Sequence, residues 1–371
     1  MRKLLITGLL IVLGSVTLAC EERSSDSIPL VVYDMNDDYM QDFTDKIREE
    51  ADDDYAIELH DSKNSQTIQN EIIESLIEED PPLIVVNPVD RLGARIIIQK
   101  AKQADIPLVF INREPLQEDL DLYDKAYYIG ADPAESADLQ AETVVDLFGD
   151  DPENLSKYDT NDDDRIQTAV LMGQQGHQDA EIRTKRVIEA LENFGYDLDL
   201  LDIKVANFNR LEGREAMVEL IDVYGDDIEL VISNNDAMAV GAVTALENEG
   251  LIEDTDENGV IDHADEPWVP VVGIDGLDIA RTLIETGHLY ATVLNDSAQM
   301  AEALVELIDF IETEKPMEDY PFTLEDDTYV WIDYQTFAQE IDENEEPSNS
   351  DSGDSEEDDN ATNESDDDPD H

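Results

Sequence analysis

The chain has 371 residues, more than one domain of ordinary size needs, and 41% of them are hydrophobic, which is enough for two cores. Its 94 acidic and 22 basic residues give a net charge of −72. This charge excludes nucleic acid as a partner, because the phosphates would be repelled, and it argues against docking on anionic lipid by charge. Self-repulsion of this size needs salt or bound cations to screen it. The composition therefore favours a halophilic protein from a salty or alkaline habitat; the alternative is an acidic lineage with no special ecology.

Residues 1–19 are predicted to be an export signal rather than part of the fold. Two positive charges precede an apolar run that is too short to span a membrane stably. The only cysteine, Cys20, ends the stretch "TLAC", which resembles the lipobox of bacterial lipoproteins apart from Thr17, where those boxes usually have Leu. The resemblance implies a lipid on the Cys20 thiol, with residues 20–27 as a tether. The alternative is a conventional signal peptide with a chance cysteine.

Strand-like apolar runs then alternate with helical runs of 10–15 residues, which is typical of βαβ units and parallel sheets. We expect strands at residues 28–34, 55–61, 81–88, 106–113, 168–173, 201–208, 228–234 and 270–275. We expect helices at residues 37–51, 65–80, 89–105, 180–195, 213–225 and 237–250. The number of strands predicts an α/β fold with two doubly wound, Rossmann-like parallel sheets. Residues 343–371 are acidic and polar without Lys or Arg, which predicts a disordered tail.

Ligands of open α/β sheets bind beyond the carboxyl ends of the strands. The polar and aromatic residues that follow the apolar runs are Asp37, Tyr39, Asn87, His177, Asp179, Arg183, Phe208, Asn235, Asp275 and Asn295. Carboxylates, amides and a guanidinium pair with hydroxyl groups, and aromatic rings cover C–H faces, so this set suits a neutral polyol. We find no Ser–His pair at a nucleophile elbow, no phosphate loop and no reactive cysteine in the sequence, so we do not expect an enzyme.

Each of these residues also has a purely structural interpretation. Asp179 precedes a predicted helix as an N-cap does, and Asp179 and Arg183 have the spacing of an i,i+4 ion pair. Asn235 has the place of a cap for the next helix, and Tyr39 and Phe208 fit a buried core. The convergence of the whole set at strand ends favours a binding cleft.

Seven stretches carry a resemblance to a known family: "NDDYM", "HDSKNSQTIQNEII", "DKAYYIGAD", "GHQDAEIR", "NNDAMAVGA", "VVGIDG" and "TVLND". With them the chain resembles the periplasmic galactose/glucose-binding proteins, solute receptors of ABC importers, over about residues 28 to 342. The resemblance implies a type 1 periplasmic binding fold, in which two lobes joined by three crossings close over one sugar. It implies that Tyr39 and Phe208 stack on the sugar and that the other eight residues clamp its hydroxyls. The family usually has Phe in place of Tyr39 and Trp in place of Phe208, which leaves the preferred epimer open.

The resemblance also implies lobe boundaries and a role. One lobe is expected to comprise residues 28–112 and 296–330, and the other residues 113–295 and 331–342. The expected role is an extracytoplasmic lipoprotein, on the outer face of the cell membrane or in the periplasm, that delivers galactose or glucose to an ABC permease. A receptor for another polyol such as a pentose, and a sugar sensor coupled to a chemoreceptor or a kinase, stay open. A sugar-responsive repressor is disfavoured, since the chain has an export signal and no basic DNA-binding head.

The stretch "DTNDDDRIQ" spaces oxygen-bearing residues as a calcium-binding loop does. Positions 1, 3, 5, 7 and 9 of an EF-hand-type loop fall on Asp159, Asn161, Asp163, Arg165 and Gln167. An Arg is acceptable at position 7, which gives only its carbonyl. The resemblance implies a structural calcium site here, closed by Glu229. Asp164 stands where such loops prefer Gly, and the alternative is an acidic linker.

A second stretch, "DTDENGVIDHAD", has the pattern of another such loop. Its acidic and amide positions are Asp254, Asp256, Asn258, Asp262 and Asp265, and Gly259 takes position 6, where the chain turns sharply. Position 12 is Asp265 rather than the usual Glu, so magnesium or weaker calcium binding is also open. Chance matches are common in so acidic a chain, which is the alternative interpretation.

Overall fold

The computed structural model describes residues 27–52 and 54–339. The predicted export signal, Cys20 and the acidic tail at 343–371 lie outside the described residues. None of the helices in the described ranges is both long and apolar enough to cross a membrane.

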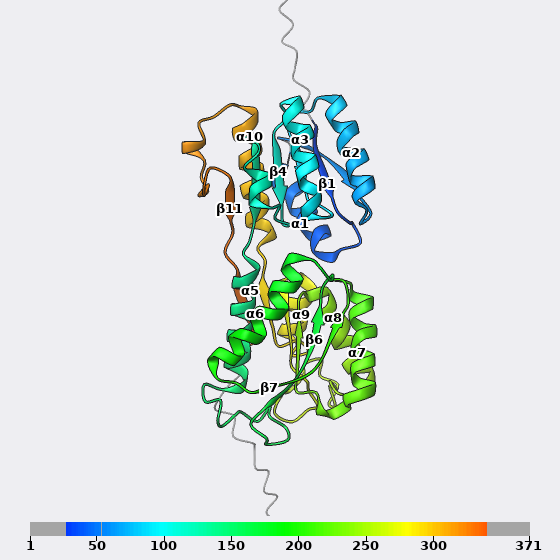
Figure 1. Ribbon diagram of the computed structural model, residues 1–371. Helices are drawn as coiled ribbons and strands as arrows, with labels where there is room; N and C mark the ends of the chain where they lie inside the picture. The colour runs from blue at the N-terminus through cyan, green and yellow to red at the C-terminus, as the bar shows by residue number, and fades with distance from the viewer. Residues whose placement is uncertain (1–26, 53, 340–371) are drawn as a thin grey trace, which may run out of the picture.

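The first lobe is built on a parallel sheet with the strand order β11-β5-β4-β3-β1-β2. Its strands are β1 (Ser27–Val32), β2 (Ala56–Asp61), β3 (Ile84–Val86), β4 (Leu108–Ile111), β5 (Ala126–Gly130) and β11 (Tyr329–Trp331). Its helices are α1 (Asp38–Ala51), α2 (Gln66–Glu79), α3 (Ala94–Ala104), α4 (Gln117–Leu120) and α10 (Ser297–Glu312), with 3-10 turns η1 (Arg91–Gly93) and η3 (Met317–Asp319). Helices α1 and α10 cover one face of the sheet, and α2 and α3 cover the other (Figure 1).

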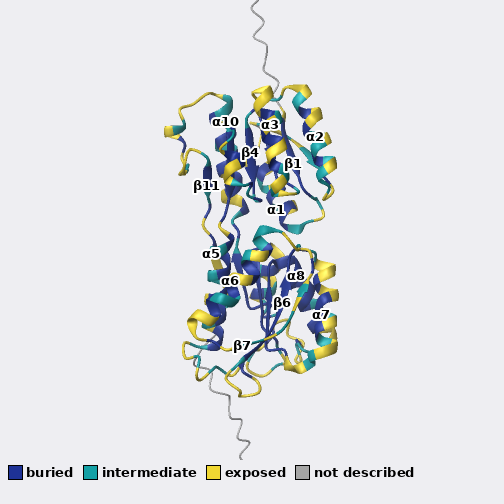
Figure 2. Ribbon diagram, viewed as in Figure 1, coloured by how far each residue is buried: buried dark blue, intermediate teal, exposed yellow. Residues whose placement is uncertain are grey.

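The second lobe repeats this plan with the strand order β12-β10-β9-β8-β6-β7. Its strands are β6 (Ile166–Met172), β7 (Leu198–Val205), β8 (Leu230–Ser233), β9 (Val271–Asp275), β10 (Ala291–Leu294) and the antiparallel edge strand β12 (Gln335–Ala338). Its helices are α5 (Pro133–Phe148), α6 (Gln178–Phe194), α7 (Arg210–Tyr224), α8 (Asp236–Glu249) and α9 (Asp278–Glu285), with the 3-10 turn η2 (Gly225–Asp227). Figure 2 shows buried strands at the centre of each lobe and exposed outer faces on the helices. The predicted fold class, two α/β lobes with parallel sheets, is confirmed.

The boundary predicted at residue 112 is wrong, because the first lobe continues through β5. Strand β5 pairs in parallel with β4, with Leu108 opposite Ala126, and β11 pairs with β5 in the same sheet. The chain therefore crosses between the lobes at residues 131–132, 295–296 and 332–334. The error arose because the stretch that forms β5 was not identified as a strand.

The sheets determine where the polar residues lie. In both lobes the carboxyl ends of the strands point toward the other lobe, and the helices that follow begin at this edge (Figure 1). Asp37 caps α1 by accepting from the Met40 N–H at 2.9 Å, and Asn235 caps α8 by accepting from the Met238 N–H at 3.0 Å. His177 caps α6 through its ring Nδ1 atom, which accepts from the Asp179 N–H at 3.2 Å. Capping therefore fixes side chains at the edge where the lobes meet.

Candidate functional site

A cavity with about 370 Å³ of atom-free space, including its open mouth, lies between the carboxyl ends of the two sheets. It is lined by Tyr33, Asp37, Tyr39, Met40, Asn112, Arg113, His177, Asp179, Arg183, Phe208, Asn235, Asp275 and Asn295. The structure thus brings together all the predicted strand-end residues except Asn87. For Asp37, His177 and Asn235, capping and lining coexist, so the structural and the binding interpretations do not exclude each other.

Asn87 does not face the cavity, because its amide is used inside the first lobe. The residue is fully buried, and its Oδ1 atom accepts from the Tyr33 N–H at 3.3 Å. Its Nδ2 group donates to the Ile111 carbonyl at 3.0 Å and to Asn112 Oδ1 at 3.3 Å. The structure corrects the prediction: Asn87 ties the ends of β1 and β4 together behind the wall, and Asn112 lines the cavity.

Sequence reasoning missed Asn112 and Arg113, which line the cavity directly after β4. Both are polar residues that follow a strand, as the other site residues are, but the predicted strand at 106–113 included them and so ended too late. The Arg113 guanidinium lies over the Tyr33 ring, 3.5 Å from its centre, and Nη1 donates to the Val89 carbonyl at 2.9 Å. Stacking and hydrogen bonding together fix one positive charge beside the cavity.

Arg183 supplies the second positive charge. It is buried, with Nη1 donating to the Asn234 carbonyl at 2.9 Å and Nη2 donating to the Tyr334 hydroxyl at 2.9 Å. The ion pairs of the described residues do not include Asp179 with Arg183, so the simple i,i+4 interpretation of this pair fails. Burial raises the pKa of the Asp179 carboxyl, and the nearby Arg183 lowers it in part.

Two buried polar atoms of the cavity residues have no hydrogen-bond partner in the described part of the chain. They are the Nε donor of Arg183 and the Oδ1 acceptor of Asn295. Buried polar groups are almost always paired, and an unpaired one costs about 1–3 kcal/mol. A hydroxyl group donates and accepts, so a ligand rich in hydroxyls satisfies both kinds of atom. The cavity is therefore suited to a polyol.

Asp275 is the last residue of β9, and a second carboxylate, that of Asp236, holds the turn that follows it. Its φ of 132° is rare for a residue other than glycine, which is typical of a site where function imposes backbone strain. Asp236 accepts from the N–H groups of Gly276 at 2.8 Å and Leu277 at 2.9 Å, and from Thr292 Oγ1 at 2.7 Å. These bonds fix the turn that presents Asp275. Burial raises the pKa of Asp236 to about 6 and raises that of Asp275 well above its usual range.

Besides Tyr33, one further aromatic ring lines the cavity from each lobe. Tyr39 comes from α1 and Phe208 from the turn after β7, and both are buried. Phe208 meets the His177 ring edge-on, with centroids 5.3 Å apart. A Cβ atom at Gly173 would lie 2.1 Å from the Phe208 ring, so only glycine leaves room for the ring there. The two rings provide apolar surface beside the polar groups.

Three side-chain contacts join the two lobes. Gln178 Nε2 donates to Glu114 Oε2 at 3.0 Å, and Arg113 Nη2 donates to Gln174 Oε1 at 3.3 Å. Arg210 of the second lobe pairs with Asp38 of the first at 2.6 Å. These bonds need both lobes in place, so they hold the arrangement in which the cavity is closed between them.

The first predicted calcium loop is folded around buried carboxylates. Glu229, nearly fully buried, accepts from the Thr160 N–H at 2.6 Å and from the Gln167 N–H at 3.3 Å, so it lies against the loop as predicted from the resemblance. Gln167 donates to Asp163 Oδ2 at 3.0 Å, while its buried Oε1 atom has no partner in the described residues. The guanidinium of Arg165 forms ion pairs outside the loop with Asp197 and Asp199, so Arg165 offers the loop only its backbone carbonyl.

In the second predicted loop, the carboxylate that lies beside Asp254 and Asp256 is that of Glu266 rather than Asp265. The carboxylate oxygens of Asp254, Asp256 and Glu266 lie within 4.8 Å of one another, and Asp265 is not among them. Glu266 accepts from the N–H groups of Thr255 at 2.5 Å and Asp262 at 2.9 Å, and these contacts lower its pKa to about 2. The Glu266 N–H donates to the Asp262 carbonyl at 2.9 Å, and this turn places the Glu266 carboxylate beside Asp254 and Asp256.

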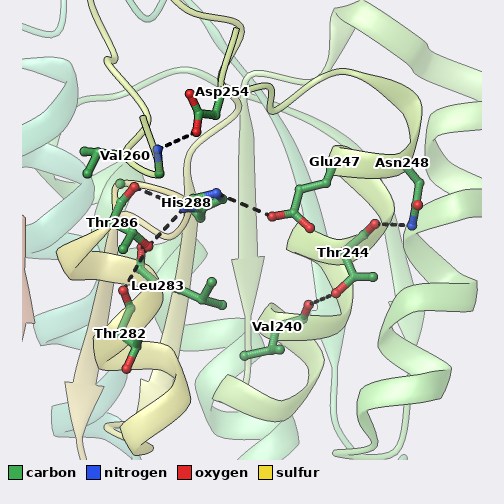
Figure 3. A network of polar contacts seen from close by, with 12 residues as sticks. Val240, Thr244, Glu247, Asn248, Asp254, Val260, Thr282, Leu283, Thr286 and His288 are labelled. Atoms are coloured by element: carbon green, nitrogen blue, oxygen red, sulfur yellow. Dashed lines mark hydrogen bonds and ion pairs between the residues drawn. The ribbon is translucent and has the colours of Figure 1, made fainter. Parts of the chain in front are cut away.

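Asn258 and Asp262 accept from N–H groups of their own loop, from Val260 at 2.8 Å and Ala264 at 2.9 Å. Figure 3 shows this loop beside His288, which contacts Glu247 of α8 at 3.6 Å. The ring of His263 stacks on that of Trp268 at 3.5 Å. Tyr158, next to the first loop, meets the same indole at 5.3 Å, so both acidic loops rest on one aromatic cluster.

A sequence profile of the periplasmic binding protein domain matches residues 28–315. The chain belongs to the periplasmic binding protein family. It is 34% identical over 297 residues to the D-galactose/methyl-galactoside binding periplasmic protein MglB of Haemophilus influenzae, covering 79% of this chain and 82% of that protein. It is 23% identical to the ribose import binding protein RbsB of Escherichia coli, covering 84% of this chain and 93% of that protein.

Solved structures agree in fold. A solute binding protein of an ABC transporter from Bacillus halodurans, with bound myo-inositol, superposes with a TM-score of 0.67 at 25% identity, covering 85% of this chain and 94% of that one. A periplasmic solute binding protein from Actinobacillus succinogenes, with bound D-allose, superposes with a TM-score of 0.69 at 19% identity, covering 85% and 98%. The receptor is thus an extracytoplasmic sugar-binding component of an ABC transporter and not an enzyme.

His177 should stay neutral in the receptor. Burial lowers its pKa well below the usual value, and Arg113 and Arg183 lower it further. Because its pKa is lowered, the His177 ring stays neutral as the pH falls from about 8 to about 6. Its hydrogen is on Nε2, since Nδ1 accepts from the Asp179 N–H. Nitrogen chemical shifts of His177 are expected to show this tautomer unchanged over that range. An inflection near the pKa of a free histidine would contradict the prediction.

Proposed function

We propose that the receptor captures a single hexose, galactose or glucose, and passes it to the permease of an ABC importer. The observation that carries the proposal is the unpaired donor of Arg183 and the unpaired acceptor of Asn295 in one cavity with the rings of Tyr39 and Phe208. The relative with 34% identity, named for D-galactose and methyl-galactoside, supports a hexose. The predicted lipid on Cys20 would keep the receptor at the outer face of the membrane.

In the proposed complex the carboxyl groups of Asp37, Asp179 and Asp275 accept hydrogen bonds from sugar hydroxyl groups, and Arg113 and Arg183 donate hydrogen bonds to sugar oxygens. The rings of Tyr39 and Phe208 cover the C–H faces. Lobe closure is selected because the sugar makes contacts with both lobes only when the cleft is shut. No covalent bond changes.

The ring at position 208 bears on which hexose is preferred. Phe is smaller than the Trp that is usual in the galactose/glucose-binding proteins, so it covers less of one sugar face. A pentose receptor is the alternative within the same site, and the ribose-binding relative at 23% identity supports keeping it open. A sensory role, in which the closed form is recognised by a chemoreceptor or a kinase, uses the same binding step.

Titration calorimetry with galactose, glucose, xylose and ribose tests this proposal. We expect one sugar per chain and preference for a hexose. Asp275→Ala removes both carboxyl oxygens from a buried site and should weaken binding by about 100-fold or more. Asp278→Ala, an exposed acidic residue three positions on, is the matched control and should bind as the unchanged receptor does. Binding of a pentose alone would change the proposed substrate from a hexose to a pentose. Binding of none of the four sugars would overturn the proposal.

We further propose that the first acidic loop holds a structural calcium ion. The residues fit the ion: Asp159 and Glu229 are 7% and 2% exposed, and the buried Gln167 Oε1 has no protein partner. Carboxylate, amide and carbonyl oxygens are the ligands that calcium takes. Asp159, Asn161, Asp163 and Gln167 would bind through side chains, Arg165 through its carbonyl, and Glu229 from the start of β8. The ion would neutralise carboxylates that otherwise repel each other.

Calcium should raise the melting temperature of the receptor by several degrees at concentrations far above the dissociation constant, because ligands of the native state stabilise it by mass action. Glu229→Gln keeps the size of the side chain but removes its charge, and should abolish most of this rise. Glu249→Gln, which makes the same charge change at an exposed helix end, should leave it intact. Equal calcium responses in all three proteins, measured by scanning calorimetry, would refute the site.

The second loop stays a prediction, with Glu266 in the place first given to Asp265. If it binds an ion, calorimetric titration with calcium should find two ions per chain, and Glu266→Gln should lose one of them. Asp265→Asn should keep both, because its carboxylate lies outside the cluster. One calcium ion per chain in every protein would contradict this site. Loss of the second ion in Asp265→Asn would instead support the original assignment of Asp265.

A further inference from the structure

Tyr334 lies in the third crossing, between β11 of the first lobe and β12 of the second. It is 6% exposed and belongs to a buried cluster that draws on both lobes and includes Met300 of the first and Ile274 and Val293 of the second. It does not line the cavity. Sequence reasoning gave it no role, and the sugar contacts proposed above do not use it.

The hydroxyl of Tyr334 is bound to the arginine of the cavity. It accepts from Arg183 Nη2 at 2.9 Å, while Arg183 Nη1 is held by the Asn234 carbonyl. Two of the three nitrogens of the guanidinium are thus fixed from behind. The third, Nε, is the buried donor without a partner at the cavity. A planar group held at two corners presents its remaining donor in one direction, so Tyr334 helps to set that direction.

The same residue is also tied to the first crossing. Its backbone N–H donates to Glu135 Oε2 at 3.4 Å, and Glu135 lies in the first turn of α5, just after residues 131–132. Two residues earlier, the Ile332 N–H donates to the Gly130 carbonyl at the end of β5, at 2.9 Å. Tyr334 therefore links two of the three crossings to Arg183, the side chain that is proposed to bind the sugar. A change in the hinge that shifts this crossing also shifts an acceptor of Arg183.

We propose that Tyr334 is a positioning residue, which orients Arg183 for the sugar and couples its hold on the sugar to the geometry of the hinge. The inference rests on the proposed function, because it deepens the role of Arg183 in the same site. Its alternative is that the hydroxyl only satisfies a buried arginine and that any loss on its removal reflects packing in the hinge. The two interpretations differ in whether the loss of sugar binding on removal of the Tyr334 hydroxyl depends on Arg183.

A double-mutant cycle separates them. The preferred sugar is titrated into the unchanged receptor, Tyr334→Phe, Arg183→Lys and the double variant. Tyr334→Phe keeps the ring and removes only the acceptor, and should raise Kd about tenfold, as loss of one charge-assisted hydrogen bond does. In the Arg183→Lys background the same change should alter Kd by less than about twofold. Tyr320→Phe, which removes a buried hydroxyl bonded to the Ala303 carbonyl at 2.6 Å far from the cavity, should leave Kd unchanged.

Two outcomes overturn the inference: an unchanged Kd in Tyr334→Phe, or an undiminished effect in the Arg183→Lys background. Urea unfolding of the same proteins without sugar provides a readout that does not need the proposed function. There the stability loss in Tyr334→Phe should be smaller in the Arg183→Lys background, which reports the contact itself. If no sugar binds the unchanged receptor but this coupling is present, the proposed function fails while the contact stands. If the coupling is absent, the positioning role fails whatever the receptor binds.

Discussion

The receptor depends on one constraint, that the carboxyl ends of two parallel sheets face each other across three short crossings. Parallel strands place the start of every following helix at the same edge, so caps, strained turns and strand-end side chains of both lobes meet in one place. This explains why Asp37, His177 and Asn235 serve as helix caps and cavity walls at once. The local need for a cap and the global need for a binding group are met by the same side chain, so a substitution there changes both.

Electrostatics at this edge contrast with the rest of the chain. Over the whole chain the acidic residues exceed the basic ones by far, yet the cavity holds two guanidiniums among three carboxylates. Each guanidinium is fixed from behind: Arg113 by the Tyr33 ring and the Val89 carbonyl, and Arg183 by carbonyl and hydroxyl oxygens. Buried charges need such partners before any ligand arrives. The receptor thus has preorganised donors where its surface would otherwise offer mainly acceptors.

The far end of the second lobe has its own arrangement of charge. Two acidic loops rest on a cluster that includes Tyr158, His263 and Trp268, and both keep their carboxylates close through bonds to backbone N–H groups. The cluster gives the loops a shared apolar base, which limits how far either can open to relieve repulsion between carboxylates. This physical link makes the indole of Trp268 a natural fluorescent reporter of either loop.

The sequence by itself determined the α/β class, the two lobes and nine of the residues at the cavity, because strand–helix alternation and the position just after an apolar run are local properties. It also located both acidic loops from spacing alone. Only the tertiary structure decided between neighbours. Asn87 and Asn112 both follow apolar strands. Strand order places Asn87 between β1 and β4, where its amide bonds to backbone groups of both neighbours, whereas Asn112 lies at the cavity. Likewise, a single turn of backbone placed Glu266 rather than Asp265 beside Asp254 and Asp256, and parallel pairing with β4 assigned β5 to the first lobe. These outcomes depend on contacts between segments far apart in the chain, and local pattern carries no information about which of two suitable side chains such contacts will turn inward.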